Sequence, residues 1–196
     1  MEIQETRRFF PENWLGPFGV EALFPRTAPF EVDVGCGKGR FLLARSAAHP
    51  EVNFLGIDRM LRRIRKVDKK AVRAGLGNIR LLRMDACYAV SFLIPPNCVS
   101  AYYIFFPDPW PKLKHHHNRL FDRRFMDALV RTLVPGGAIH FATDHLPYFD
   151  EVRDLIAADD RFEPIETFVP RDEEKTDFEL MFIAHKPIGR CSFRKR

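Results

Sequence analysis

The sequence predicts an α/β fold of the doubly wound kind, in which helices cover both faces of a mostly parallel sheet. Short apolar runs alternate with stretches of helical spacing along most of the 196 residues, which favours successive strand–helix units. The first apolar run leads through a glycine-rich loop directly into a helix. The last two apolar runs have no clear helix between them, so we expect an antiparallel hairpin at one edge of the sheet.

The first half of the chain contains three predicted strands, each followed by a predicted helix. The strands are expected at residues 30–34, 53–57 and 79–84, and the helices at residues 40–48, 60–74 and 86–93. The second helix is the clearest, because Met60, Ile64, Val67 and Ala71 recur at helical spacing with basic residues on its other faces. Gly75 ends that helix.

The second half continues the pattern and brings the expected number of strands to seven. The strands are expected at residues 99–106, 138–143, 162–166 and 178–184, and the helices at residues 125–133 and 148–157. Pro135-Gly136-Gly137 terminates the first of these helices. We expect a single domain over residues 1–196, with its core at about 30–185, a short N-terminal extension and a basic C-terminal tail.

The composition predicts a cytoplasmic protein without a membrane segment. Hydrophobic residues make up 46% of the chain and include 19 phenylalanines, which suffices for one core. No run of 18 apolar residues predicts a membrane span, and the charged N-terminus does not resemble a secretory signal. The four cysteines are scattered, which predicts neither a disulfide framework nor a zinc site.

The net charge of +5 is unevenly distributed. Between Arg59 and Arg73, eight cations stand against the single acid Asp68. A second basic group, near three histidines, contains Lys112, Lys114, Arg119, Arg123 and Arg124. Clustered cations suit the phosphates of a nucleic acid, although a merely solvated helix face is the alternative for the first group.

The segment DVGCGKG at residues 33–39 has the character of a ligand-binding loop between a strand and a helix. Gly35, Gly37 and Gly39 permit tight turns and the close approach of a ligand. A dinucleotide-binding loop has its third glycine one position later, where this chain has Arg40. Asp33 would repel a pyrophosphate but attract the ammonium group of a methionine moiety. An ordinary strand-end acid is the alternative for Asp33.

Acidic residues also end the next two predicted strands. Asp58 stands 23 residues after Gly35, where a carboxylate can accept hydrogen bonds from ribose hydroxyls. Asp85 can accept a hydrogen bond from an adenine amino group while the Ala86 N–H donates to the ring. Because the carboxyl ends of parallel strands share one edge of a sheet, these acids predict a single cofactor crevice.

The fourth predicted strand runs into the segment PDPWPK at residues 107–112. The prolines on either side of Asp108 fix the backbone and hold the carboxylate in one direction. Trp110 offers a flat face on which a flipped base can stack. Lys112 and the basic residues that follow can meet phosphates. The adjacent histidines at 115–117 point in different directions, so no metal site is expected there.

This segment resembles the hallmark of bacterial tRNA (guanine-N7-)-methyltransferases, which typically reads FPDPWPKKRHHKRR. Further matches are GIDR at 56–59, DA at 85–86, ATD at 142–144 and TDFE at 176–179, so the resemblance covers about residues 30–185. It implies a Rossmann-like class I methyltransferase sheet of seven strands with one reversed. It also implies S-adenosyl-L-methionine as cofactor and tRNA as partner, with the variable-loop guanine as target. The sequence leaves open whether the protein is a monomer or a homodimer.

The resemblance assigns roles to individual residues. The cofactor-binding residues would be Asp33, Gly35, Gly37, Gly39, Asp58, Arg59, Asp85, Ala86 and Asp108. The substrate-binding residues would be Trp110, Lys112, Asp144, Thr176, Asp177, Phe178 and Glu179. Asp108 is also the expected catalytic residue, since it can anchor a guanine through N1–H and the 2-amino group. Asp177 and Asn118 stand where the family pattern has cations. These two differences affect the expected contacts with RNA and not the expected chemistry.

Three other functions fit parts of the sequence. A nicotinamide-dependent oxidoreductase would use a related sheet, but the glycine spacing, Asp33 and the absence of a Tyr-x-x-x-Lys pair disfavour it. A non-catalytic RNA-binding protein would not be expected to keep the four acids Asp33, Asp58, Asp85 and Asp108. An amino-group methyltransferase commonly has an Asn/Asp-Pro-Pro-aromatic turn, whereas here Asp108 lies between two prolines.

Overall fold

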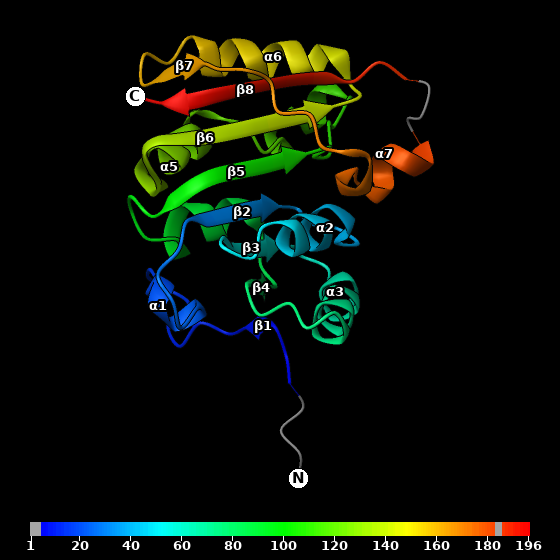
Figure 1. The fold of residues 1–196 in the computed structure, drawn as a ribbon. Helices are drawn as coiled ribbons and strands as arrows, with labels where there is room; N and C mark the ends of the chain where they lie inside the picture. Colours follow the sequence, from blue (N-terminus) through cyan, green and yellow to red (C-terminus); the bar gives the residue numbers. More distant parts are fainter. Residues whose placement is uncertain (1–4, 183–185) are drawn as a thin grey trace.

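An eight-stranded sheet forms the centre of the computed structural model, which describes residues 5–182 and 186–196. Its strand order is β1-β4-β3-β2-β5-β6-β8-β7 (Figure 1). The strands are β1 (Arg8–Phe9), β2 (Phe30–Val34), β3 (Asn53–Ile57), β4 (Ile79–Leu82), β5 (Val99–Phe105), β6 (Leu133–Thr143), β7 (Phe162–Pro164) and β8 (Gly189–Lys195). Strand β8 runs antiparallel to both β6 and β7, and the other pairings are parallel.

Helices cover both faces of this sheet (Figure 1). The α-helices are α1 (Val20–Leu23), α2 (Arg40–Ala48), α3 (Leu61–Arg73), α4 (Ala86–Tyr88), α5 (Arg123–Thr132), α6 (Leu146–Ala157) and α7 (Asp177–Phe182). Shorter helical turns are η1 (Ala89–Leu93), η2 (Leu113–Asn118) and η3 (Asp172–Glu174). In the part of the chain that the structure describes, no helix combines the length and apolar character needed to cross a bilayer.

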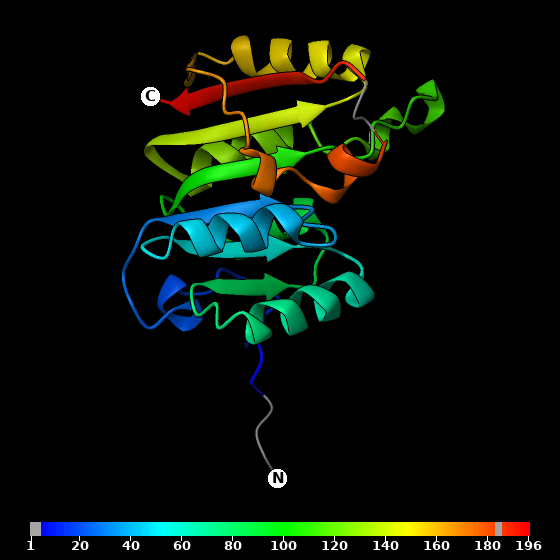
Figure 2. The ribbon, with the colours of Figure 1, turned by 45° about the vertical axis from the view of Figure 1, so that its right-hand side comes forward.

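Successive residues of a strand point to opposite faces, so each central strand contributes to two cores. Leu55 and Ile57 of β3 belong to the larger core, which also contains side chains from α5 and α6. On the opposite face of β3, Phe54 packs with Ile64 and Val67 of α3. Helices α2 and α3 lie side by side over this second face (Figure 2). The alternation explains why the central strands read as continuous apolar runs.

Most predicted elements are confirmed. Strands β2 and β3 and helix α2 have the predicted bounds, and β8 is the single reversed strand of the predicted α/β fold. Strand β6 begins at Leu133 rather than residue 138, because the residues around Pro135 form an irregularity within the strand rather than a separate turn.

The prediction of a strand at residues 178–184 is wrong. Residues 177–182 form helix α7, and Ile183 and Ala184 lie outside the described residues. The run FELMF is apolar without a clear period, and such short runs do not distinguish helix from strand. Thr176 decides the outcome locally, because its Oγ1 accepts a hydrogen bond from the Glu179 N–H at 3.0 Å, as a residue before a helix does.

The last strand is β8, in the segment that the sequence suggested was a basic tail. Its buried Cys191 and Phe193 alternate with other residues, and they join the larger core. Flanking arginines and lysines concealed this period-two pattern. The reversed strand of the predicted edge hairpin therefore exists, but it lies about ten residues later in the chain, and its partner β7 forms the edge of the sheet.

The N-terminal segment adds an unpredicted eighth strand, β1, beside β4. The Asp68 carboxylate of α3 holds it in place by accepting hydrogen bonds from the Arg7 N–H at 2.6 Å and the Thr6 hydroxyl at 3.0 Å. A two-residue strand has too little pattern to be recognised in a sequence. It nevertheless orders the segment that leads to Phe10.

Gly39 is expected to be the most sensitive glycine of the loop before α2. Its φ is +78°, and a Cβ added there would lie 2.6 Å from Cγ2 of Val67 in α3. Backbone strain and overpacking together should make Gly39→Ala less stable by about 2 to 4 kcal/mol. Urea denaturation followed by circular dichroism measures this loss. Gly77→Ala is the matched control, since Gly77 has no positive φ and open space around it; equal midpoints for the two variants would contradict the packing argument.

Candidate active site

A cleft of about 320 Å³ opens at the carboxyl ends of β2 and β5. Three segments far apart in the sequence form it: the glycine loop after β2, the proline-rich segment after β5, and the segment that contains α7. Of the predicted site residues, the cleft contains Asp33, Gly35, Gly37, Asp108, Thr176, Asp177 and Phe178. The fold thus places the expected cofactor loop, the expected catalytic residue and part of the expected substrate segment around one space.

The glycine loop has a left-handed backbone at Gly35 and Gly37, with φ of +80° and +57°. A Cβ added at Gly35 would meet nothing within 4 Å, so a side chain there would project into open space and not into the protein. The N–H groups of Gly35 and Cys36 both donate to the Ile57 carbonyl at 2.9 Å. The loop is therefore fixed to β3 while its outer side stays accessible to a ligand.

Asp33, the next-to-last residue of β2, has a carboxylate that is buried without a hydrogen-bond donor. The residue is only 5% exposed, and within the described ranges no side chain or N–H donates a hydrogen bond to its carboxylate. Burial, and secondly the charge of Asp58, raises the pKa of Asp33 to about 8. Buried charges in proteins are normally paired, so a carboxylate left free beside a cleft is suited to a cationic ligand.

Asp58 lies behind the glycine loop and is already engaged by donors. Its carboxylate accepts hydrogen bonds from the Gly37 N–H at 3.1 Å, the Met60 N–H at 2.7 Å and Nη1 of Arg63 at 3.2 Å. Arg63 in turn lines the cleft. Asp58 therefore links the loop after β2 to the start of α3.

The other predicted cofactor residues lie outside the lining of the cleft, after β3 (Arg59), after β4 (Asp85 and Ala86) and at the end of the glycine loop (Gly39). Asp85 is exposed and precedes α4, where its carboxylate accepts a hydrogen bond from the Tyr88 N–H at 3.1 Å. Ala86 is the first residue of α4, and Arg59 is exposed. Gly39 packs against α3 rather than facing the cleft. These residues share the carboxyl edge of the sheet with Asp33, as predicted from the topology.

The segment after β5 has a strained backbone. Phe106 and Trp110, on either side of Asp108, have φ of +53° and +42°, which is uncommon for aromatic residues and is maintained only where the surroundings impose it. One restraint is Arg119, whose Nε donates to the Pro109 carbonyl at 2.9 Å. The exposed carboxylate of Asp108 is thus presented to the cleft from a fixed backbone.

Arg119 was predicted to contact phosphates together with its basic neighbours, but its side chain is directed into the protein. Its side chain is 5% exposed, it forms an ion pair with Glu151, and its guanidinium lies 4.9 Å from the centre of the Tyr148 ring. Spacing alone could not distinguish this buried arginine from its neighbours Lys112 and Lys114, which are exposed.

The three histidines lie in η2, close to Trp110. The rings of Trp110 and His115 are 5.8 Å apart and tilted. Among the residues that the structure describes, no three His, Cys, Asp or Glu side chains are grouped as metal ligands. Lys112 immediately precedes η2 and is exposed.

The predicted substrate segment at 176–179 divides between the cleft and the protein interior. The ring of Phe178 contacts that of Phe106 at 5.3 Å, and Asp177 lines the cleft. Glu179 is instead buried and forms an ion pair with Arg190 of β8. Asp144, at the end of β6, lies 4.0 Å from Nζ of Lys186 and outside the cleft lining.

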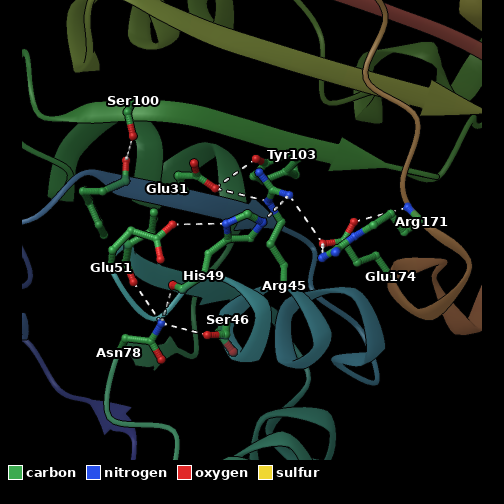
Figure 3. Close-up of polar contacts among 12 residues, drawn as sticks. Glu31, Arg45, Ser46, His49, Glu51, Asn78, Ser100, Tyr103, Arg171 and Glu174 are labelled. Carbon is green, nitrogen blue, oxygen red and sulfur yellow. Dashed lines mark hydrogen bonds and ion pairs between the residues drawn. The ribbon is translucent and has the colours of Figure 1, made fainter.

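A polar network behind the cleft joins α2 to the segment that leads into α7 (Figure 3). Arg45 of α2 pairs with Glu31 and Glu174, each at 3.4 Å, and its guanidinium lies over the Tyr103 ring. Arg171 also pairs with Glu174, at 3.0 Å. None of these residues was expected to matter from the sequence. Their network fixes the wall of the cleft that carries Thr176 and Phe178.

The cleft also contains cations and apolar side chains that were not predicted. They include Lys38, Arg40, Arg63, Phe105, Met181 and Phe182. Lys38 and Arg40 could have been found as the residues between and after the loop glycines. Met181 and Phe182 could not, because their segment was interpreted as a strand.

Comparison with known proteins adds independent evidence. Residues 27–182 match a family model described as "Putative methyltransferase". The chain is 40% identical over 148 residues to a tRNA (guanine-N(7)-)-methyltransferase of Halorhodospira halophila, covering 76% of this chain and 64% of that protein. A protein of the same name from Leifsonia xyli is 36% identical over 169 residues, which cover 84% of this chain and 74% of that protein.

The fold has solved counterparts among methyltransferases. The structure of the 16S rRNA methyltransferase KamB superposes with a TM-score of 0.62 at 15% identity, covering 90% of this chain and 91% of that chain. At this identity the likeness concerns the fold alone. It agrees with the α/β architecture predicted from the sequence.

Proposed function

This chain belongs to the tRNA (guanine-N(7)-)-methyltransferase family, and on that premise we propose that it methylates N7 of a guanine in tRNA with S-adenosyl-L-methionine, releasing S-adenosyl-L-homocysteine. The observation that carries the proposal is the uncompensated Asp33 carboxylate, which faces the same cleft as the proline-flanked Asp108. A cytoplasmic location follows from the substrate.

The residues around the cleft fit the cofactor. Asp33 provides a buried carboxyl group that would ionise to pair with the ammonium group of the methionine moiety, and Gly35 leaves the loop open where a Cβ would project. Asp58 and Asp85 would serve the ribose and the adenine amino group, with the Ala86 N–H toward the ring and Arg59 alongside. When bound, the cofactor supplies a methyl group already activated by the positive charge on sulfur.

Guanine N7 has a free lone pair in the neutral base, so no proton has to be removed before methyl transfer. The protein's task is then to align the base and to stabilise the positive charge that develops on the purine. Asp108 would accept hydrogen bonds from guanine N1–H and the 2-amino group, and its negative charge would oppose the charge developing on the ring. Asp108 is thus a positioning and electrostatic residue rather than a general base.

The remaining predicted residues would contact the RNA. Trp110 would stack on the flipped base, and Lys112 would meet a phosphate. Asp144, Thr176, Asp177 and Phe178 would border the guanine, while Glu179 would act from behind them through its pair with Arg190. The variable-loop guanine is the target that the family implies.

Incubation of the protein with unmodified tRNA and labelled S-adenosyl-L-methionine tests the proposal. Borohydride reduction followed by aniline should cleave the labelled tRNA at one guanine. Label without cleavage would exclude N7 and would favour an amino-group methyltransferase. Titration with NAD, which should show no binding, separates the proposal from an oxidoreductase.

A further inference from the structure

The outer face of α3 carries a dense group of cations without acidic partners. This basic face consists of Arg62, Arg65, Lys66, Lys69, Lys70 and Arg73, all exposed. Arg63 of the same helix pairs with Asp58. For the six residues of the basic face, no acidic group of the described residues lies within ion-pair distance. Figure 2 shows α3 along the edge of the sheet, in front of β4.

The basic face is unfavourable for the isolated protein. Residues four apart on a helix are neighbours, so Arg62 and Lys66, Arg65 and Lys69, and Lys69 and Arg73 repel each other. The only acid in the helix, Asp68, is turned toward β1 and engaged there. A bound polyanion would relieve this repulsion.

Several cations elsewhere on the surface are neutralised within the chain. Arg153 pairs with Asp150 and Asp154, Arg161 pairs with Asp127 and Asp159, and Arg196 pairs with Glu163. A second exposed group without ion pairs follows β5 and leads into α5, but α3 has seven cations and one acid within thirteen residues and is the densest concentration of positive charge in the described residues. Such a concentration, rather than the net charge itself, indicates a partner with a regular array of negative charges.

An exposed aromatic ring lies beside the basic face. The groove between β1 and α3 is lined by Arg8, Phe9, Phe10, Leu61, Ile64, Arg65, Leu81 and Arg83. Phe10 is 63% exposed, and the Arg8 guanidinium lies 5.4 Å from the centre of its ring. Phe9, by contrast, packs inward against Phe18. A flat ring among cations is the combination on which an unpaired base stacks.

The basic face is also continuous with the cleft. Arg63, in the first turn of α3, lines the cleft, and the helix continues for about 15 Å from that point to Arg73. The apolar residues Ile64, Val67 and Ala71 face the sheet, so α3 has no free apolar side with which to enter a membrane. An RNA strand that presents a base to the cleft can therefore continue along α3.

We propose that the basic face of α3 binds the phosphodiester backbone of the RNA substrate, and that Phe10 stacks on one of its unpaired bases. This inference rests on the proposed function for the identity of the RNA. The face would supply affinity and orientation, while base recognition and methyl transfer take place in the cleft.

Binding to unmodified tRNA as a function of salt concentration tests the basic face. The variant combines Arg65→Gln, Lys69→Gln and Arg73→Gln, and the control combines Arg153→Gln, Arg161→Gln and Arg196→Gln, which removes the same charge from neutralised sites. At about 0.15 M salt the variant should bind tRNA roughly 10- to 100-fold more weakly, and its plot of log affinity against log salt should be shallower by about 2 to 3. The control should retain the native slope.

Phe10 is tested separately, because it changes no charge. Phe10→Ala should weaken tRNA binding about tenfold without changing the salt slope, and Phe10→Trp should restore it. Equal affinity of the native protein and Phe10→Ala would remove Phe10 from the proposal.

Methylation assays separate this inference from the proposed function. If the native protein methylates N7 but the α3 variant and its control have the same KM for tRNA and the same salt slope, the basic face is not the RNA site. If the native protein binds tRNA through α3 but methylates no guanine, the basic face stands and the proposed function fails. Loss of binding to phosphatidylserine vesicles, with tRNA binding unchanged, would assign the face to membranes and overturn the proposal.

Discussion

Replacing Asp33 with Asn is expected to stabilise the protein at alkaline pH and to abolish tight binding of S-adenosyl-L-homocysteine. Burial, assisted by Asp58, raises the pKa of Asp33 to about 8 in the folded protein, whereas an aspartate in an unfolded chain titrates near about 4. The folded state therefore favours the protonated form. That contribution to stability is fully present below about pH 4 and is lost as the pH rises through 8.

The stability of the two proteins should diverge with pH. Between pH 5 and pH 8 the native protein should lose about 1.4 kcal/mol per pH unit relative to Asp33→Asn, roughly 3 to 4 kcal/mol in all. For a protein of this size the melting temperatures should differ by about 10 °C at pH 8. Thermal denaturation at pH 5, 6.5 and 8 measures the difference. A gap that stays constant with pH would show that the carboxylate is compensated in the fold.

Ligand binding should improve as the pH rises, whereas stability falls, because Asp33 must be ionised to hold an ammonium group. Affinity of the native protein for S-adenosyl-L-homocysteine should fall about tenfold for each pH unit below 8. Asp33→Asn should bind about 100-fold more weakly at pH 8, without that pH dependence. Methylthioadenosine lacks the ammonium group and should bind both proteins alike. Calorimetric titration measures both affinities. If the native protein and Asp33→Asn bound S-adenosyl-L-homocysteine equally well, Asp33 would be excluded from the cofactor site.

Local patterns in the sequence predicted those residues of the candidate site that can be recognised within a single short segment. Asp33 and the loop glycines were recognisable because a strand, a turn and a helix follow one another within ten residues. Asp108 was recognisable from its two flanking prolines. Their arrival at one cleft followed from topology, since parallel strands end at the same edge of a sheet.

Contacts between distant segments could not be predicted in this way. The pairing of Arg45 with Glu174 joins residues 129 positions apart, and no local pattern indicates which cations face inward. Arg119 illustrates the same limit, because nothing in the sequence distinguishes its buried side chain from that of an exposed basic residue. Helix α7 was missed because six mainly apolar residues fit a strand or a helix equally well, and only the tertiary surroundings select between them.

The second large effect is expected at Asp108. Asp108→Ala should lower the rate of tRNA methylation by about 100- to 1000-fold, which is the usual loss when a preorganised electrostatic group is removed from an active site. The fold should be retained, because Asp108 is exposed and the strained backbone around it is held by Arg119. Affinity for S-adenosyl-L-homocysteine should stay within a few-fold, since the ammonium is assigned to Asp33.

A substrate change can separate recognition of the base from a general disturbance of the cleft. Inosine lacks the 2-amino group of guanine but keeps N1–H and N7. If Asp108 accepts a hydrogen bond from that amino group, the native protein should methylate tRNA with inosine at the target position about 10- to 100-fold less efficiently than normal tRNA. Asp108→Ala should no longer distinguish the two substrates.

The comparison of kcat/KM for the four combinations of protein and tRNA isolates the contact between Asp108 and the amino group. A purely structural role for Asp108 would lower methylation of both tRNAs by the same factor and leave the preference for guanine intact. Retained preference in Asp108→Ala would therefore refute the proposed contact even if activity fell. An unchanged rate with normal tRNA would refute the electrostatic role as well, and it would move the recognition of the base to Trp110 and the segment at 176–178.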